Sequence, residues 1–161
     1  MPETAGFILG EFRRTIDDRY RISIPTELAE PLGAQGKQCI LTKERPGSLS
    51  LWSAGEWQQK IDASVQLIEA KMRAGRLDGR VEHVQQMGRL LSTRHTQVEL
   101  QGRGRVLIPE AFRDFLGVDA GGELLIVGAA VCIEIWQPQA WIRYLEEHMP
   151  EFRQLFDDLA N

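Results

Sequence analysis

The chain has 161 residues, of which 43% are hydrophobic, 26% charged and only 7% aromatic, a balance typical of a folded protein. Nineteen lysines and arginines against 23 acidic residues give a net charge of −4, so no overall positive field indicates a nucleic-acid partner. The longest apolar run, 124–133, is too short to span a bilayer, and no signal segment opens the chain. We therefore expect a soluble, cytoplasmic protein with no membrane association.

Cysteine and histidine usage argues against a metal centre. Cys39 and Cys132 lie in separate apolar runs and form no CxxC or Cys/His cluster, which excludes a zinc knuckle or a disulfide scaffold. The histidines His83, His95 and His148 are far apart and lack metal-ligand spacing. We expect no metal and no other cofactor.

One sequence pattern occurs twice. The segment 21–25 (RISIP) is matched 84 residues later by 105–109 (RVLIP), and the same offset carries Trp52 onto Trp136. A repeat of this length changes the fold question from one long chain to two related units.

The first unit is predicted to hold a strand, a tight turn, a returning strand, a short helix and a second hairpin. In chain order these are residues 7–16, 17–20, 21–24, 26–32, and 38–42 with 49–52. Pro25 ends the returning strand because it has no N–H to donate, and Gly33 suits the left-handed position after a helix.

Long helices should follow the first unit. Ser53 and Glu56 match a capping box, which predicts a helix from there to a stop near Gly75. A second helix is predicted from Asp78 to Leu91, leading into the second unit.

The second unit repeats the order of the first. We expect strands at 97–100 and 105–108 around a turn at 101–104, a helix at 110–116, strands at 123–127 and 131–136, and a helix from Pro138. After Pro150 an amphipathic tail follows. The resulting division is 1–76 for the first unit with its long helix, 77–93 for a connecting helix, 94–149 for the second unit and 150–161 for the tail.

Neither unit can bury both faces of its strands alone. We therefore predict an α+β fold, mainly β at its core, in which the two units interleave around a pseudo-twofold axis into one closed β-core with flanking helices.

Arginines gather at the two equivalent turns: Arg14, Arg19 and Arg21 at the first, and Arg94, Arg103 and Arg105 at the second. A guanidinium is a rigid fork of donors that fits phosphate oxygens or the edge of guanine, and a two-stranded ribbon can enter the major groove. The pattern favours a bipartite DNA-binding protein. The alternative is structural, with Asp17 holding Arg21 in an ion pair that closes the turn.

Four segments resemble the MraZ family of bacterial DNA-binding transcriptional regulators: 10–12, 16–25, 102–109 and 133–136. The resemblance covers about residues 7–145. The D-x-x-x-R motif of that family is complete from Asp17 to Arg21, whereas the second copy has Gln101 before Arg105. Tyr20 stands where the family usually has glycine.

The resemblance implies a swapped-hairpin, AbrB-like β-barrel of the SpoVT-AbrB type and ring-like homo-oligomers. It also implies that the protein binds double-stranded DNA with direct repeats. The expected location is the nucleoid, and the expected role is control of the division and cell-wall gene cluster. On this interpretation Arg21 and Arg105 lie closest to the DNA, with Arg113 on the short helix as a lesser candidate. Phosphate anchoring is assigned to Arg13, Arg14, Arg19 and Arg103.

Two other functions remain open at this stage. The first is an antitoxin-like protein-interaction module on the same fold, whose partner would bind the apolar and acidic segment 152–159. The second is an enzyme that uses Asp17 and Asp18, but no nucleophile or pocket motif accompanies this pair. We expect no enzymatic activity and no small-molecule substrate.

Overall fold

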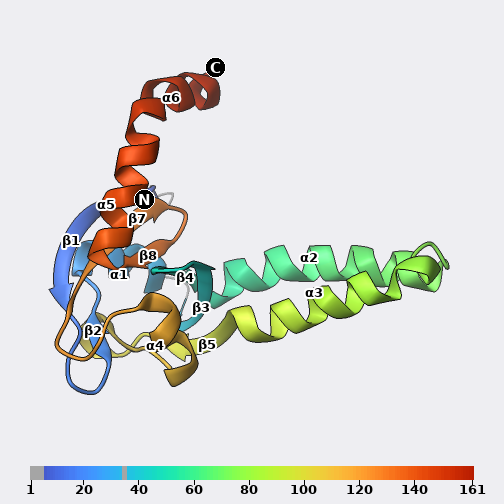
Figure 1. The fold of residues 1–161 in the computed structure, drawn as a ribbon, viewed down its shortest axis with the longest axis horizontal. Helices are drawn as coiled ribbons and strands as arrows, with labels where there is room; N and C mark the ends of the chain where they lie inside the picture. Colours follow the sequence, from blue (N-terminus) through green and yellow to red (C-terminus); the bar gives the residue numbers. More distant parts are fainter. Residues whose placement is uncertain (1–5, 34–35) are drawn as a thin grey trace.

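The computed structural model describes residues 6–33 and 36–161 (Figure 1). The strands are β1 (Ile8–Thr15), β2 (Arg21–Ser23), β3 (Gln38–Arg45), β4 (Ser48–Ser53), β5 (His95–Glu99), β6 (Arg105–Leu107), β7 (Glu123–Ala130) and β8 (Ile133–Trp136). The helices are α1 (Thr26–Gly33), α2 (Ala54–Arg73), α3 (Val81–Arg94), α4 (Glu110–Leu116), α5 (Pro138–His148) and α6 (Phe152–Ala160). Short 3-10 turns are η1 (Asp78–Arg80), η2 (Gly102–Gly104) and η3 (Met149–Glu151).

The larger sheet is built by exchange of strands between the two halves. Its six strands run in the order β1-β7-β8-β4-β3-β5, and every neighbouring pair is antiparallel. β1 of the first half pairs with β7 of the second, while β5 of the second half pairs with β3 of the first. β4 and β8 join the halves at the centre. The fold is therefore α+β, as predicted, with a mostly antiparallel sheet.

The sequence repeat reappears in the elements. An offset of 84 carries β2 onto β6, the start of α1 onto that of α4, and the start of α2 onto that of α5. It also relates buried core positions in pairs: Ile16 and Leu100, Ile22 and Val106, Ile24 and Ile108, Leu28 and Phe112, and Leu32 and Leu116. The two halves thus contribute equivalent side chains to one hydrophobic core.

The hairpins predicted at 7–24 and at 97–108 were both wrong in their pairing, and in the second unit β5 pairs with β3 and not with β6. β1 pairs along its whole length with β7, and β2 pairs with β6 in a separate two-stranded sheet. Segments next to each other in sequence often pair, but here each strand has its full ladder with the other half. The residues between β1 and β2 form a tight turn that leads from one sheet to the other.

The predicted closed β-core is not found. β1 and β5 are the two ends of the six-stranded sheet, and within the described residues no ladder joins them. The core instead lies between this sheet, the β2–β6 pair and the short helices α1 and α4.

A second apolar cluster lies under α5. Trp136 and Trp141 are buried with their ring centroids 5.0 Å apart, and they pack with Leu125, Val127 and Ala140. The equivalent rings, Trp52 and Trp57, lie 5.9 Å apart and are half-buried. The tryptophans therefore pack against each other, as expected of structural residues.

The helices α2 and α3 form a long arm that projects away from the sheets (Figure 1). The capping box is confirmed, because the Ser53 side chain accepts a hydrogen bond from the Glu56 backbone N–H at 3.4 Å. α2 ends at Arg73, close to the predicted stop at Gly75, whose φ is +72°. We refer to α2, η1 and α3 together as the arm.

The C-terminal helices leave the sheets in a different direction from the arm. α5 continues through η3 into α6, which lies far from the arm (Figure 1). Among the described residues, no helix has both the length and the apolar character needed to cross a membrane.

Candidate nucleic-acid interface

Residues from both halves line one open depression on the surface. They are Arg14, Thr15, Asp17, Arg21, Ser23, Arg103 and Arg105. Four guanidinium groups and one carboxylate meet there, so the site carries a positive formal charge within an acidic chain. We call this site the arginine depression.

The two-stranded β2–β6 sheet supplies the floor of the arginine depression. Ile22 pairs with Val106 at its centre, and both side chains are buried. Because side chains alternate along a strand, Arg21 and Arg105 both face the other way. Arg21 pairs with Leu107 and Arg105 pairs with Ser23, which makes the two arginines diagonal neighbours, a spacing of roughly 7–8 Å.

The first turn fixes both the backbone and the side chain of Arg21. Asp17 Oδ1 accepts hydrogen bonds from the backbone N–H groups of Arg19 and Arg21 at 2.8 and 2.9 Å. Asp17 Oδ2 accepts from Arg21 Nε at 3.0 Å. The backbone N–H of Arg21 first, and also that of Arg19 and the Arg21 guanidinium, hold the pKa of Asp17 below its ordinary value although burial opposes this. The ion pair of the structural alternative is therefore present.

The second turn keeps the backbone hydrogen bond that closes the first, but it has a different φ at Arg103 and fewer side-chain bonds. Gln101 N–H donates to Arg105 O at 2.8 Å, as Asp17 N–H donates to Arg21 O at 3.0 Å. The Gln101 side chain makes no capping hydrogen bond to η2, and Arg103 is held at a φ of +66°. Arg105 thus lacks the carboxylate that orients Arg21.

Reciprocal backbone bonds join the two turns. Ile24 N–H donates to Gly104 O and Ile108 N–H donates to Tyr20 O, each at 2.8 Å. These four residues are related by the 84-residue offset. The two arginine-bearing turns are therefore joined by backbone hydrogen bonds on one face of the protein.

Tyr20 takes the left-handed conformation of its glycine counterpart. Its φ is +62°, against +71° for Gly104. The guanidinium carbon of Arg113 lies 4.1 Å from the centroid of the Tyr20 ring, and Arg113 Nε donates to Ile108 O at 2.9 Å. A side chain in this conformation costs roughly 1–2 kcal/mol, and a cation over an aromatic ring is an attractive contact that acts against this cost. The same contacts give Arg113 a structural position beside the turn.

Some predicted site residues lie outside the arginine depression. Arg13 points to the opposite face of β1 from Arg14 and pairs with Glu123 at 3.2 Å. Arg19 is exposed in the first turn but does not line the depression. Arg94 lies at the end of α3, where its Nη2 and Nε donate to Lys43 O at 2.7 and 3.1 Å, so it does not surround the second turn.

Two polar residues of the depression were missed by sequence reasoning. Thr15 follows Arg14 at the end of β1, and Ser23 lies two positions after Arg21 on the exposed face of β2. The period-two alternation of a strand would have placed Ser23 beside Arg21.

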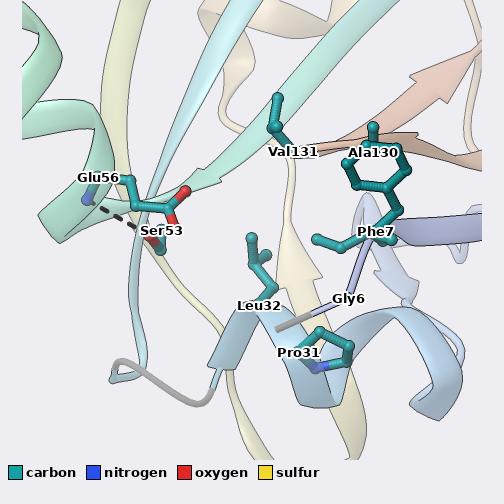
Figure 2. Close-up of a pocket in the computed structure, with 9 residues that line it drawn as sticks. Gly6, Phe7, Pro31, Leu32, Ser53, Glu56, Ala130 and Val131 are labelled. Carbon is teal, nitrogen blue, oxygen red and sulfur yellow. Dashed lines mark hydrogen bonds between the residues drawn. The ribbon is translucent and has the colours of Figure 1, made fainter. Parts of the chain in front are cut away.

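Another hollow in the surface lacks cations (Figure 2). Apolar residues dominate its lining, among them Phe7, Leu32 and Val131, with Ser53 and Glu56 on one side. Its volume of about 170 Å³ is below the roughly 300 Å³ of small-molecule sites.

The remaining reactive residue types show no site in the described part of the chain. No group of three or more His, Cys, Asp or Glu could hold a metal ion there. Cys39 and Cys132 are buried, and burial raises the pKa of their thiols to about 11 and about 12. Both thiols are therefore protonated at neutral pH and poor nucleophiles.

Known proteins resemble the chain over almost its whole length. A family model described as "MraZ protein, putative antitoxin-like" matches residues 91–160. The "Transcriptional regulator MraZ" of Shewanella sp. (strain W3-18-1) is 31% identical over 148 residues, which cover 91% of this chain and 88% of that protein. Proteins of the same name from Syntrophomonas wolfei and Desulforamulus reducens are 26% and 27% identical, and their matches cover 95% of this chain.

The D-x-x-x-R segment and the second turn carry the resemblance to this family, and both lie in the arginine depression. At 31% identity over nine tenths of the chain, this protein belongs to the MraZ family, whose curated relatives are named transcriptional regulators.

Proposed function

We propose that this protein regulates transcription by binding double-stranded DNA through the arginine depression. The observation that carries the proposal is the convergence of Arg14, Arg21, Arg103 and Arg105, from both halves of the chain, on one open face. An acidic protein that concentrates guanidinium groups in one place has a local attraction for phosphate that its net charge conceals.

Arg21 and Arg105 are assigned the contacts nearest to the bases. Their diagonal spacing of roughly 7–8 Å corresponds to about two base-pair steps, because each DNA strand rises about 3.4 Å per nucleotide. One β2–β6 ribbon can therefore place both forks about two base pairs apart in a major groove, which admits a two-stranded ribbon. Arg14 and Arg103, at the rim, are assigned to phosphates, and Arg13 and Arg19 are weaker candidates for that role.

The finer description of the fold belongs to this proposal. We assign the chain to the swapped-hairpin, AbrB-like class, supported by the exchange of β1 and β5 between the halves. We keep the division into units 1–76 and 94–149, with a connecting helix at 77–93 and a tail at 150–161. The function involves no catalytic step, cofactor or small-molecule substrate, and its place is the cytoplasm, at the nucleoid.

We further propose that several copies assemble in a ring and bind direct repeats, in the control of division and cell-wall genes. Joining sites makes later contacts intramolecular and can raise apparent affinity by ~10²–10⁴. Repeats should lie about one helical turn apart, ~10 base pairs. Affinity should rise from one repeat to four and fall when half a turn is inserted between repeats. Affinity that responds to neither change would contradict the ring.

A direct test of the depression compares arginines inside and outside it. Arg21→Ala and Arg105→Ala should each weaken binding to a DNA fragment by ~1–3 kcal/mol, the size of a bidentate base contact, and leave thermal unfolding nearly unchanged. Arg89→Ala is the matched control, because Arg89 is exposed on α3 and does not line the depression. Equal losses for all three variants in fluorescence anisotropy would reject the depression as the site.

An antitoxin-like interaction module is the second candidate. The exposed apolar face of α6 favours it, because such a face is typical of a protein-binding helix. Co-purification of a stable protein partner, together with no retardation of DNA by the protein alone, would favour this function over the first.

A further inference from the structure

The helix α6 carries an apolar face that none of the described residues covers. Phe152, Leu155, Phe156 and Leu159 are 63%, 57%, 60% and 80% exposed. Their spacing puts all four on one side of the helix, and α6 has no buried residue. A contiguous exposed apolar face of this kind marks an interaction site.

An apolar groove lies on the arm, between α2 and α3 near their connection. Its floor consists of Ile68, Leu77, Val84 and Met87. The remaining lining residues are basic or titratable: Lys71, Arg80 and His83. No carboxylate is among the residues that line it. We call it the arm groove.

The charges of the two surfaces are complementary. The segment 151–160 contains the acids Glu151, Asp157 and Asp158 but only one base, Arg153. Lys71 and Arg80 border the arm groove, and the carboxylates Asp78 and Glu82 lie outside it, in an adjoining hollow that shares Arg80 and His83. An apolar helix face flanked by acids therefore matches an apolar groove flanked by bases, which is the mode in which an amphipathic helix docks in a groove.

One chain cannot make this contact with itself. α6 and the connection between α2 and α3 lie at separate ends of the molecule (Figure 1). We propose that α6 of one copy docks in the arm groove of the next copy. This inference deepens the proposed ring assembly and rests on it.

We assign the arm groove to a second copy of this chain because each chain carries both the α6 apolar face and an arm groove. The two surfaces differ, so the contact is head-to-tail, and such contacts close into rings when the rotation between copies permits. A single helix in a groove is a small interface, but closing a ring makes its last contact intramolecular. The acidic residues of α6 argue against an anionic membrane surface as its target.

The test measures the mass of the full-length protein in solution for variants of each surface. Phe156→Glu places a charge on the apolar face of α6, and Lys71→Glu with Arg80→Glu reverses the charge of the arm groove. All three residues are exposed, so thermal unfolding should be unchanged. The wild type should be an oligomer and each variant a single chain. Gln154→Glu, on the polar side of α6, is the control and should keep the wild-type mass.

Mixing the two variants separates a head-to-tail contact from a symmetric one. The Phe156→Glu chain keeps an intact groove, and the Lys71→Glu, Arg80→Glu chain keeps an intact α6. An equimolar mixture should therefore form a dimer of one chain of each kind and nothing larger. Because this dimer has one contact and no ring closure, the mixture is measured up to the highest concentration at which both variants stay soluble, and failure to pair there would overturn the head-to-tail contact.

The other outcomes are also decisive. A wild-type oligomer whose mass neither variant changes would overturn this inference and leave the ring and the DNA site untouched. A wild type that is a single chain would overturn the ring and this inference together, while the arginine variants would still test DNA binding. If the wild type is a single chain and an unrelated protein is bound to its α6, the partner of α6 is that protein. This result would overturn the contact between copies.

Discussion

Asp17 and Arg21 are joined twice, once through the Arg21 backbone N–H at 2.9 Å and once through its Nε at 3.0 Å. One carboxylate thus sets the shape of the first turn and the direction of the guanidinium that leaves it. The ion pair and the DNA contact are compatible, because one edge of the guanidinium fork can bind Asp17 while the other donors face the depression.

Asp17→Ala should weaken DNA binding by misplacing Arg21, with a smaller effect than Arg21→Ala. Gln101→Ala should change binding less, because the Gln101 side chain makes no capping bond. The lowered pKa of Asp17 means that its contribution to stability is present above its ordinary pKa of 3.8 and is lost as the pH falls through the folded value. Thermal unfolding of the wild type and Asp17→Ala should therefore converge in acid. A constant difference between pH 7 and pH 3 would contradict this.

The first turn should exchange its amide hydrogens more slowly than the second. The Arg19 and Arg21 amides are bonded to Asp17, whereas Gln101 provides no charged acceptor in the second turn. Gln101→Asp would install the first-turn motif, so it should raise protection at Arg103 and Arg105. Hydrogen exchange read by mass spectrometry checks both statements, and equal protection in the wild-type turns would be the opposing result.

Gly104→Ala should destabilise the protein strongly. A Cβ at this position would lie 2.5 Å from Ile24 O, and φ is +71°, so the left-handed conformation alone costs about 1–2 kcal/mol. The melting temperature should fall by roughly 2–4 °C for each kcal/mol lost in a protein of this size. Gly102→Ala is the control, because a Cβ there would meet no atom within 4 Å. Similar melting temperatures for the two variants would show that the turns are not tightly packed.

Glu134→Gln should stabilise the protein at neutral pH. Burial, and then the neighbouring Glu44, raise the pKa of Glu134 although Trp136 Nε1 donates to its Oε1 at 2.9 Å. A raised carboxyl pKa means that the wild type loses stability as the pH rises from the ordinary value of 4.5 through the folded value. The free energy of unfolding of Glu134→Gln should exceed that of the wild type at pH 7 and equal it near pH 4. A gain for Glu134→Gln that persists at pH 4 would have another cause.

The repeat made the order of elements predictable in both halves, since the alternation around residues 21–25 and 105–109 is local information. Strand partners were not predictable in the same way. Alternation tells which face of β1 is apolar, but it does not distinguish β2 from β7 as a partner, because both offer an apolar face.

Some of the arginine positions could likewise be predicted from the sequence, and others could not. Arg13 and Arg14 are adjacent in a strand, so alternation alone already separates them to opposite faces. Arg94 was misplaced because the 84-residue offset maps it onto Gly10 and not onto an arginine of the first turn. The diagonal placement of Arg21 and Arg105 depends on β2 pairing with β6, which only the three-dimensional structure reveals.

The most direct test of the central claim is to sequence the DNA fragments that the protein selects from a random pool. The wild type and the Arg21→Ala, Arg105→Ala double variant would be compared at the same salt concentration. The account predicts that the wild type enriches a motif repeated at intervals of ~10 base pairs, and that the double variant enriches none. A wild type that selects no motif, or a double variant that selects the same one, would contradict DNA recognition by the arginine depression.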